Sequence, residues 1–197
     1  MRLRLVGRES CPHLQVLSIA LMEADSEFQV EGHADTAAGV ATRLEVDGLV
    51  IHDLLAICEF VDEALDGPGL LPAEPLERAL ARDWFQRARF TLVPAVERLI
   101  GGDSGAAVVV DSFLDQVGID LAGRDFLTGG GGAFGLADLG AAAALCRLDL
   151  LARAGRWTPR ATAPVQAWMA RVLAEPTVDF STPPGLGAAL GAGAATA

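Results

Sequence analysis

The first residues that could do chemistry lie near the N-terminus, in the segment GRESCPHLQVLSIAL at positions 7–21. Cys11 stands directly before Pro12, and proline is favoured in the first turn of an α-helix, so Cys11 is expected at a helix N-terminus. Free N–H groups and the helix dipole at such a position favour an anion and lower the pKa of a thiol. Arg8 would add to this effect and Glu9 would oppose it. The alternative is that Cys11 is only a small, partly buried apolar residue.

The other thiols and imidazoles are weaker candidates. Cys58 and Cys146 lie in apolar, helix-like segments and are expected in the core. His13 is either part of the pocket around Cys11 or a solvated side chain. The three histidines of the chain are scattered, without paired carboxylates or cysteines. This pattern predicts no metal site.

The composition describes a chain with a large core and an acidic surface. Apolar residues make up 51% of the 197 residues, and the formal net charge is −11. That charge argues against binding to nucleic acid or to anionic membrane surfaces. Charged residues interrupt the longest apolar run, LADLGAAAALCRLDLLA, which therefore indicates a buried helix rather than a membrane span. Three cysteines without metal-like spacing favour a reduced, cytoplasmic protein without a disulfide framework.

The first 65 residues predict a small mixed sheet with helices. Asp47-Gly48 lies between two β-rich runs and is the strongest hairpin signal in the chain. Residues 12–24 and 52–65 have helical spacing of apolar residues, and residues 2–6 alternate like a strand. The predicted elements are strands at 2–6 and 27–31, a hairpin at 42–51, and helices at 12–24 and 52–65.

A second, all-helical region is expected after the segment DGPGLLPAEP at 66–75, whose prolines and glycines indicate a linker. The four-residue spacing of apolar residues predicts one long helix with a core-facing stripe, interrupted near Pro94. Residues 181–197 are low in complexity, and their composition favours a mobile tail over a packed segment. The stripe consists of Leu76, Leu80, Trp84, Ala88, Leu92 and Val96, and the further helices are predicted at 105–118, 136–153 and 160–174, within a helical domain that spans 76–180.

Four segments in this order resemble the glutathione S-transferase superfamily. SCPHLQVLSIALMEADSEFQV resembles the family's first strand-turn-helix-strand unit, in the cysteine-bearing form of omega-like members. TRLEVDGLVIHDLLAICEFVDEAL resembles its hairpin and third helix, LLPAEPLERALARDWF its linker and next helix, and FGLADLGAAAAL its buried-helix start. The resemblance implies a fold of class α/β plus all-α: a thioredoxin-like domain at 1–65 with a mixed four-stranded sheet, and a helical bundle after the linker. At the buried-helix start, Gly135 takes the cap position and Asp138 is expected to be structural.

Three family anchors for glutathione differ in this chain. Thr42 stands where the family has a cis-proline, and the bond before Thr42 is expected to be trans. Asp53 and Leu54 stand where the family has an acidic residue and a serine that hold the γ-glutamyl end. Asp53 could still pair with an ammonium group, whereas Leu54 has no hydrogen-bonding side chain.

The third difference is the loop at 32–41, which is too short for the family's second helix, so that helix is predicted to be lost. Arg43 and His33 could substitute for the groups that hold the glycyl carboxylate.

The resemblance implies glutathione as a co-substrate, without a metal. Because the chain has no tyrosine, Cys11 and Ser10 are the two candidates for thiol transfer or conjugation. The alternative is a binding or scaffold protein that kept the fold and lost ordinary glutathione binding. The family also implies a homodimer, for which the face around Phe60, Ala64 and Trp84 is one possible patch.

Overall fold

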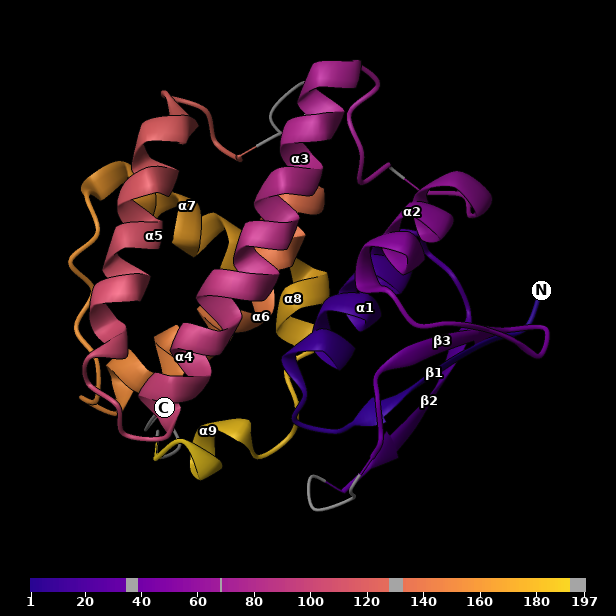
Figure 1. Cartoon of the computed structure of the whole chain (residues 1–197), viewed down its shortest axis with the longest axis horizontal. Coiled ribbons are helices and arrows are strands. Elements are labelled where there is room, and N and C mark those ends of the chain that lie inside the picture. The colour runs from indigo at the N-terminus through magenta and orange to yellow at the C-terminus, as the bar shows by residue number, and fades with distance from the viewer. Residues whose placement is uncertain (35–38, 68, 128–132, 192–197) are drawn as a thin grey trace.

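The computed structural model describes residues 1–34, 39–67, 69–127 and 133–191. Its N-terminal part is a sheet with two helices, and Figure 1 shows α1 between this sheet and the helical part of the molecule. The elements are β1 (Leu3–Arg8), α1 (Pro12–Glu23), β2 (Phe28–His33), β3 (Arg43–Val46), β4 (Leu49–Ile51) and α2 (Leu54–Ala64).

The described residues form one four-stranded sheet with the strand order β2-β1-β3-β4. β1 pairs in parallel with β2 and antiparallel with β3, and β3 pairs antiparallel with β4. The hairpin between β3 and β4 turns at Asp47 and Gly48, whose φ angles of 48° and 91° suit a two-residue type I′ turn. The predicted mixed sheet and its hairpin are therefore confirmed.

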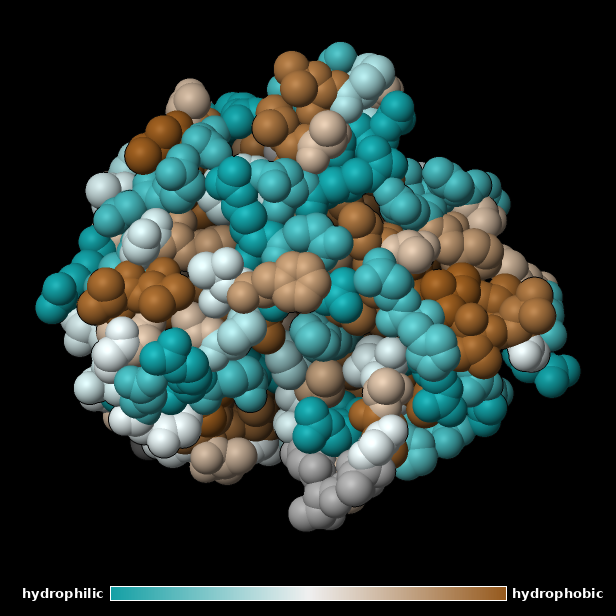
Figure 2. Space-filling model, in the orientation of Figure 1, coloured by the Kyte–Doolittle hydropathy of each residue, from teal (hydrophilic) through white to brown (hydrophobic). Residues whose placement is uncertain are grey.

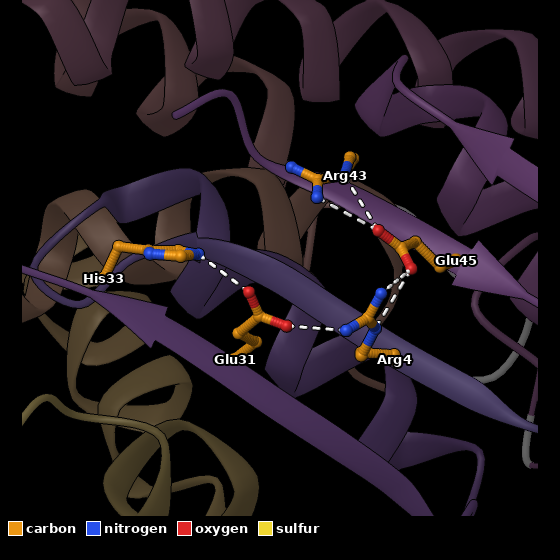
Figure 3. A network of polar contacts seen from close by, with 5 residues as sticks. All are labelled: Arg4, Glu31, His33, Arg43 and Glu45. Carbon is orange, nitrogen blue, oxygen red and sulfur yellow. Dashed lines mark hydrogen bonds and ion pairs between the residues drawn. The ribbon is translucent and has the colours of Figure 1, made fainter. Parts of the chain in front are cut away.

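A network of charged side chains lies across one face of this sheet (Figure 3). The register places Arg4 of β1 opposite Glu45 of β3, so the two side chains share a face. Arg4 forms ion pairs with both Glu45 and Glu31, and the Glu31 pair measures 2.7 Å. In the connection from β2 to β3, the structure describes residue 34 and residues 39–42, and none of these residues is helical. The family's second helix is therefore not found among them. Residues 35–38 lie outside the described ranges.

The second part of the chain is helical and packs around α6. Its elements are α3 (Pro75–Arg87), η1 (a π-helical turn over Ala88–Leu92), α4 (Val93–Ile100), α5 (Ala106–Leu121), α6 (Leu136–Arg153), α7 (Ala163–Ala174), α8 (Pro176–Phe180) and α9 (Leu186–Ala189). α6 has the predicted bounds and is buried from Leu136 to Leu148. A Cβ atom at Gly140 would lie 2.9 Å from the Cα atom of Phe85, so this glycine lets α3 pack closely against α6. None of the described helices is long and apolar enough to cross a membrane.

The predicted apolar stripe is wrong at its start, because Leu76 and Leu80 are 66% and 42% exposed. In an α-helix with 3.6 residues per turn, a residue four positions on is rotated by about 40°. A strict four-residue row therefore drifts away from the buried face. The π-helical turn of η1 has more residues per turn, which offsets this drift. The stripe residues from Trp84 onward are buried.

The described part of the predicted tail, residues 181–191, packs against the molecule where composition favoured a mobile tail. The predicted tail begins at residue 181, and its Leu186 and Leu190 side chains are only 8% and 4% exposed. The Gln15 amide donates to the Ser181 hydroxyl at 3.4 Å. The two buried leucines and the Gln15 contact hold residues 181–191 against the molecule, and residues 192–197 lie outside the described ranges. The division of the chain at 66–75 stays a prediction.

Candidate functional site

The candidate site lies where β1 ends and α1 begins. The antiparallel register between β1 and β3 pairs Val6 with Arg43, so Gly7 faces Thr42 one step further along. The absence of a side chain at Gly7 matters here, since a Cβ atom would lie 3.1 Å from the Thr42 hydroxyl oxygen. The Thr42 hydroxyl instead lies 3.5 Å from the Cys11 sulfur. The peptide bond before Thr42 is trans, as expected.

Cys11 is the N-cap residue of α1, with an extended backbone (φ −65°, ψ 124°) and Pro12 as the first helical residue. Burial alone would raise the pKa of the Cys11 thiol. Hydrogen bonds from the His13 side chain, from the Thr42 hydroxyl and from backbone N–H groups of the first turn outweigh burial and lower the pKa to about 6. A group with this pKa is mostly a thiolate at neutral pH, which is the nucleophilic form.

Cys58 and Cys146 differ from Cys11 in their burial and in the direction of their pKa shifts. Cys58 on α2 and Cys146 on α6 are 1% and 6% exposed, and both lie in the hydrophobic core. Burial raises the pKa of each thiol. All three cysteines are free. The prediction that Cys58 and Cys146 are core residues is confirmed.

His13 is half-buried, and its side chain hydrogen-bonds the Cys11 sulfur. Its Nε2 atom is buried and makes no hydrogen bond to any residue that the structure describes. His13 therefore belongs to the immediate surroundings of Cys11, one of the two alternatives left open by the sequence.

Ser10 is bound to the helical part of the molecule through its backbone. Its carbonyl oxygen accepts a hydrogen bond of 2.5 Å from the Arg147 guanidinium of α6. In the sequence, Arg147 is one of the charged residues that interrupt the apolar run LADLGAAAALCRLDLLA. A single arginine inside such a run was the signal that could have indicated a buried polar contact.

Asp53 begins α2 and also reaches across to the helical part. Its carboxylate accepts from the Ala56 N–H at 3.1 Å and pairs with Arg89 of η1 at 2.8 Å. The hydrogen bond from Arg89 is the main reason that the pKa of Asp53 is lowered. Asp53 follows the end of β4 by two residues, on the side of the sheet where β3 begins, since Leu44 pairs with Ile51. Asp53 and Cys11 thus lie at the same end of the sheet, but sequence reasoning missed Arg89.

The two proposed substitutes for the glycyl anchors are occupied by other partners. Arg43 pairs with Glu45 at 3.0 Å, and His33 contacts Glu31 at 3.0 Å. Figure 3 shows both contacts within the charged network of the sheet. Among the described residues, no group of His, Cys, Asp or Glu could hold a metal ion.

An apolar groove of about 440 Å³ lies beside α1. It runs between β2 and the segment after α8, and Glu9 at its edge belongs to the loop that carries Cys11. The lining includes Leu14, Met22, Phe28, Val30, Phe180 and Pro184.

The sequence is similar to that of glutathione transferases over one short stretch. No protein-family model matches the chain. Over 38 residues, 19% of this chain, it is 47% identical to a potato (Solanum tuberosum) protein described as "Probable glutathione S-transferase". The matched stretch spans 18% of the length of that potato protein.

The similarity of the folded chain is far more extensive. The crystal structure of glutathione transferase Omega 3C from Trametes versicolor superposes with a TM-score of 0.77 at 22% identity, over 93% of this chain and 90% of that one. The theta class glutathione S-transferase of Xanthomonas axonopodis pv. citri, solved with glutathione bound, gives a TM-score of 0.74 at 20% identity, over 93% and 98%. The chain therefore has the glutathione S-transferase fold, with a thioredoxin-like N-terminal sheet and a helical C-terminal part, as the sequence predicted.

Proposed function

We propose that this protein is a glutathione-dependent thiol transferase that uses Cys11 as its nucleophile. The observation that carries the proposal is the setting of Cys11 at the N-terminus of α1, half-buried, beside the Thr42 hydroxyl, with a pKa of about 6. The similar fold of proteins that bind glutathione supports the choice of co-substrate. Thr42 and His13 stabilise the thiolate, and Asp53 is the candidate partner for an ammonium group.

The chemistry takes two exchange steps. In the first step, the Cys11 thiolate attacks the glutathionyl sulfur of a mixed disulfide RS–SG. The bond between Cys11 and the glutathionyl sulfur forms, the RS–SG bond breaks, and RS⁻ leaves. In the second step, the thiolate of free glutathione attacks the Cys11–SG disulfide, which releases oxidised glutathione and restores the Cys11 thiolate. The substrate disulfide is reduced and glutathione is oxidised.

The proposal is tested by measuring glutathione-dependent reduction of a small mixed disulfide. The variant Cys11→Ser should lose roughly 100-fold or more of the activity, because a serine hydroxyl forms no disulfide. Ser10→Ala is the matched control and should retain activity if Ser10 acts only through its backbone. Loss of activity in Ser10→Ala with retention in Cys11→Ser would transfer the role to Ser10.

A non-catalytic scaffold is the second candidate, and the site contains a specific observation in its favour. Asp53 already pairs with Arg89, and Leu54 lacks the hydroxyl group that the family resemblance leads one to expect. Both features weaken the binding of a γ-glutamyl group. Calorimetric titration with glutathione distinguishes the candidates, because a scaffold would show no binding at millimolar concentration in either the natural chain or Cys11→Ser.

We further propose a homodimer that works in the cytoplasm. Trp84 is no longer part of the candidate patch, since it is 3% exposed and its ring packs edge-to-face against Phe113. Figure 2 shows apolar surface over the β3–β4 hairpin, where Leu49 and Val50 are 76% and 46% exposed. Dimer burial would cover such side chains. Light scattering at micromolar concentration should give a mass of twice 20.5 kDa, and a monomer mass would contradict the proposal.

A further inference from the structure

Arg147 of α6 is a buried charge beside the loop that carries Cys11. The residue is 1% exposed. Removing a guanidinium from water is unfavourable unless hydrogen bonds and opposite charges compensate. Its pairing with the Glu97 carboxylate is loose, with 3.7 Å between Nε and Oε1, and the Glu97 side chain is 51% exposed. Neutral oxygen atoms therefore stabilise much of this charge.

Those oxygen atoms lie on both sides of Cys11 in the sequence. The Arg147 guanidinium donates to the Ser10 carbonyl at 2.5 Å and to the Gln15 side-chain oxygen at 2.7 Å. It also donates to the Ala143 carbonyl of its own helix at 2.8 Å. One side chain of the helical part thus holds the end of the loop and the first turn of α1 together.

The contact with Ser10 fixes the peptide unit that leads into Cys11. The carbonyl of this unit accepts from Arg147, and its N–H, which belongs to Cys11, donates to the Arg8 carbonyl at 3.0 Å. Because a peptide unit is planar, two hydrogen bonds at opposite ends determine its orientation. The plane ends at the Cα atom of Cys11, so its orientation sets the N–Cα bond from which the Cys11 side chain extends.

We propose that Arg147 is a positioning residue for Cys11, whose guanidinium holds the Ser10–Cys11 peptide unit and Gln15 so that the sulfur stays beside Thr42 and His13. The inference rests on the reactivity of Cys11 proposed above. Arg147 acts through the Ser10 carbonyl and the Gln15 side chain. The 3.5 Å separation between the Cys11 sulfur and the Thr42 hydroxyl leaves little room for movement, since a hydrogen bond weakens quickly with distance.

The test is the pH profile of Cys11 alkylation by iodoacetamide, followed by mass spectrometry, in the full chain. In Arg147→Met the midpoint should rise by roughly one to two pH units relative to the unchanged protein, as expected for lost hydrogen bonds to an anion. Arg147→Lys keeps the charge and some donors but not the planar fork, so it should show a smaller rise. Glu97→Gln, which removes only the exposed carboxylate, is the control and should leave the midpoint unchanged.

The alkylation experiment uses no glutathione, so its outcome tests this inference separately from the proposed glutathione-dependent activity. A low midpoint that stays the same in Arg147→Met and Arg147→Lys, with only the melting temperature reduced, would show a structural link between the two parts and overturn the proposal. If Arg147→Met does not fold, as labelling of Cys58 and Cys146 would reveal, Arg147→Lys and Gln15→Met decide in the same way. An ordinary thiol midpoint in the unchanged protein would overturn both this inference and the role of Cys11.

Discussion

The N-termini of α1 and α6 are built in opposite ways. At α6, the Asp138 carboxylate is fully buried and accepts from the Leu127 N–H at 2.9 Å, the Gly135 N–H at 3.3 Å and the Trp168 indole N–H at 2.7 Å. At α1, Cys11 is only half-buried, and its sulfur lies 3.5 Å from the Thr42 hydroxyl. The Asp138 carboxylate is buried and bound by three donors, whereas the Cys11 sulfur is accessible enough to react.

The two groups reach a similar pKa from opposite directions. Burial raises the pKa of Asp138 to about 6 against the hydrogen bonds from Leu127, Trp168 and Gly135. Hydrogen bonds lower the pKa of Cys11 to about 6 against burial. The balance between burial and hydrogen bonding, and not the position at a helix N-terminus alone, therefore decides whether a cap is structural or reactive.

The largest expected effect is on folding, at α6. Asp138→Ala leaves the Leu127 and Gly135 N–H groups and the Trp168 indole without their acceptor, and each buried unsatisfied group costs about 1 kcal/mol or more. We expect a loss of about 3 kcal/mol in the free energy of unfolding, measured by urea denaturation. Asp149→Ala is the matched control on the same helix, because its pair with Arg153 is near the surface. A loss of less than about 1 kcal/mol in Asp138→Ala would show that the hydrogen bonds to Asp138 contribute little to stability.

Cysteine labelling shows whether the α1 cap is reactive. Near pH 7, iodoacetamide should modify Cys11 roughly tenfold or more faster than Cys58 or Cys146, because only the Cys11 thiol ionises readily in the folded chain. Mass spectrometry assigns the sites, and labelling in urea provides the control in which all three react. Labelling of Cys11 at the same rate as the two core thiols would indicate an inert residue.

The pH dependence of stability should have opposite slopes for the two caps. The folded pKa of Asp138, about 6, is above its unfolded value of about 3.9. Its stabilising contribution is therefore present below pH 4 and lost as the pH rises toward 6, by about 3 kcal/mol. The folded pKa of Cys11 is below its unfolded value of about 8.5. Its contribution is present above pH 8.5 and lost as the pH falls toward 6, by about 1–2 kcal/mol after allowance for exposure.

These slopes are isolated by comparing urea denaturation of the natural chain with Asp138→Asn and Cys11→Ser at several pH values. The difference in free energy between the natural chain and each variant removes the titration of all other groups. Slopes of the same sign for the two variants would contradict the account.

The smallest effect is expected at the start of α2, an intermediate case. Asp53 caps this helix, but its side chain is 53% exposed and its partner Arg89 is 20% exposed. The coupling between the two residues, from a double-mutant cycle of Asp53→Asn and Arg89→Met at pH 7, should be below about 1 kcal/mol. Because Arg89 lowers the pKa of Asp53, this small contribution should disappear as the pH falls into the acidic range. A coupling above about 2 kcal/mol would show that the pair is a main link between the two parts.

Local patterns predicted most of the elements that position the site. The Asp47-Gly48 hairpin and the bounds of α6 follow from turn chemistry and apolar periodicity, which act over a few residues. The contact of Arg147 with Ser10 joins residues 137 positions apart, and no local period carries that information. The packing of Leu186 and Leu190 was missed for the same reason, since composition does not indicate which surface a segment meets.

Thr42 substitutions show whether hydrogen bonds keep Cys11 ionised at neutral pH. Thr42→Val removes the hydroxyl with little change in volume, and Thr42→Ser keeps the hydroxyl. The alkylation midpoint of Cys11 should be near pH 6 in the natural chain and in Thr42→Ser, and roughly one unit higher in Thr42→Val. A midpoint near pH 8.5 in the natural chain, unaffected by Thr42→Val, would contradict the account.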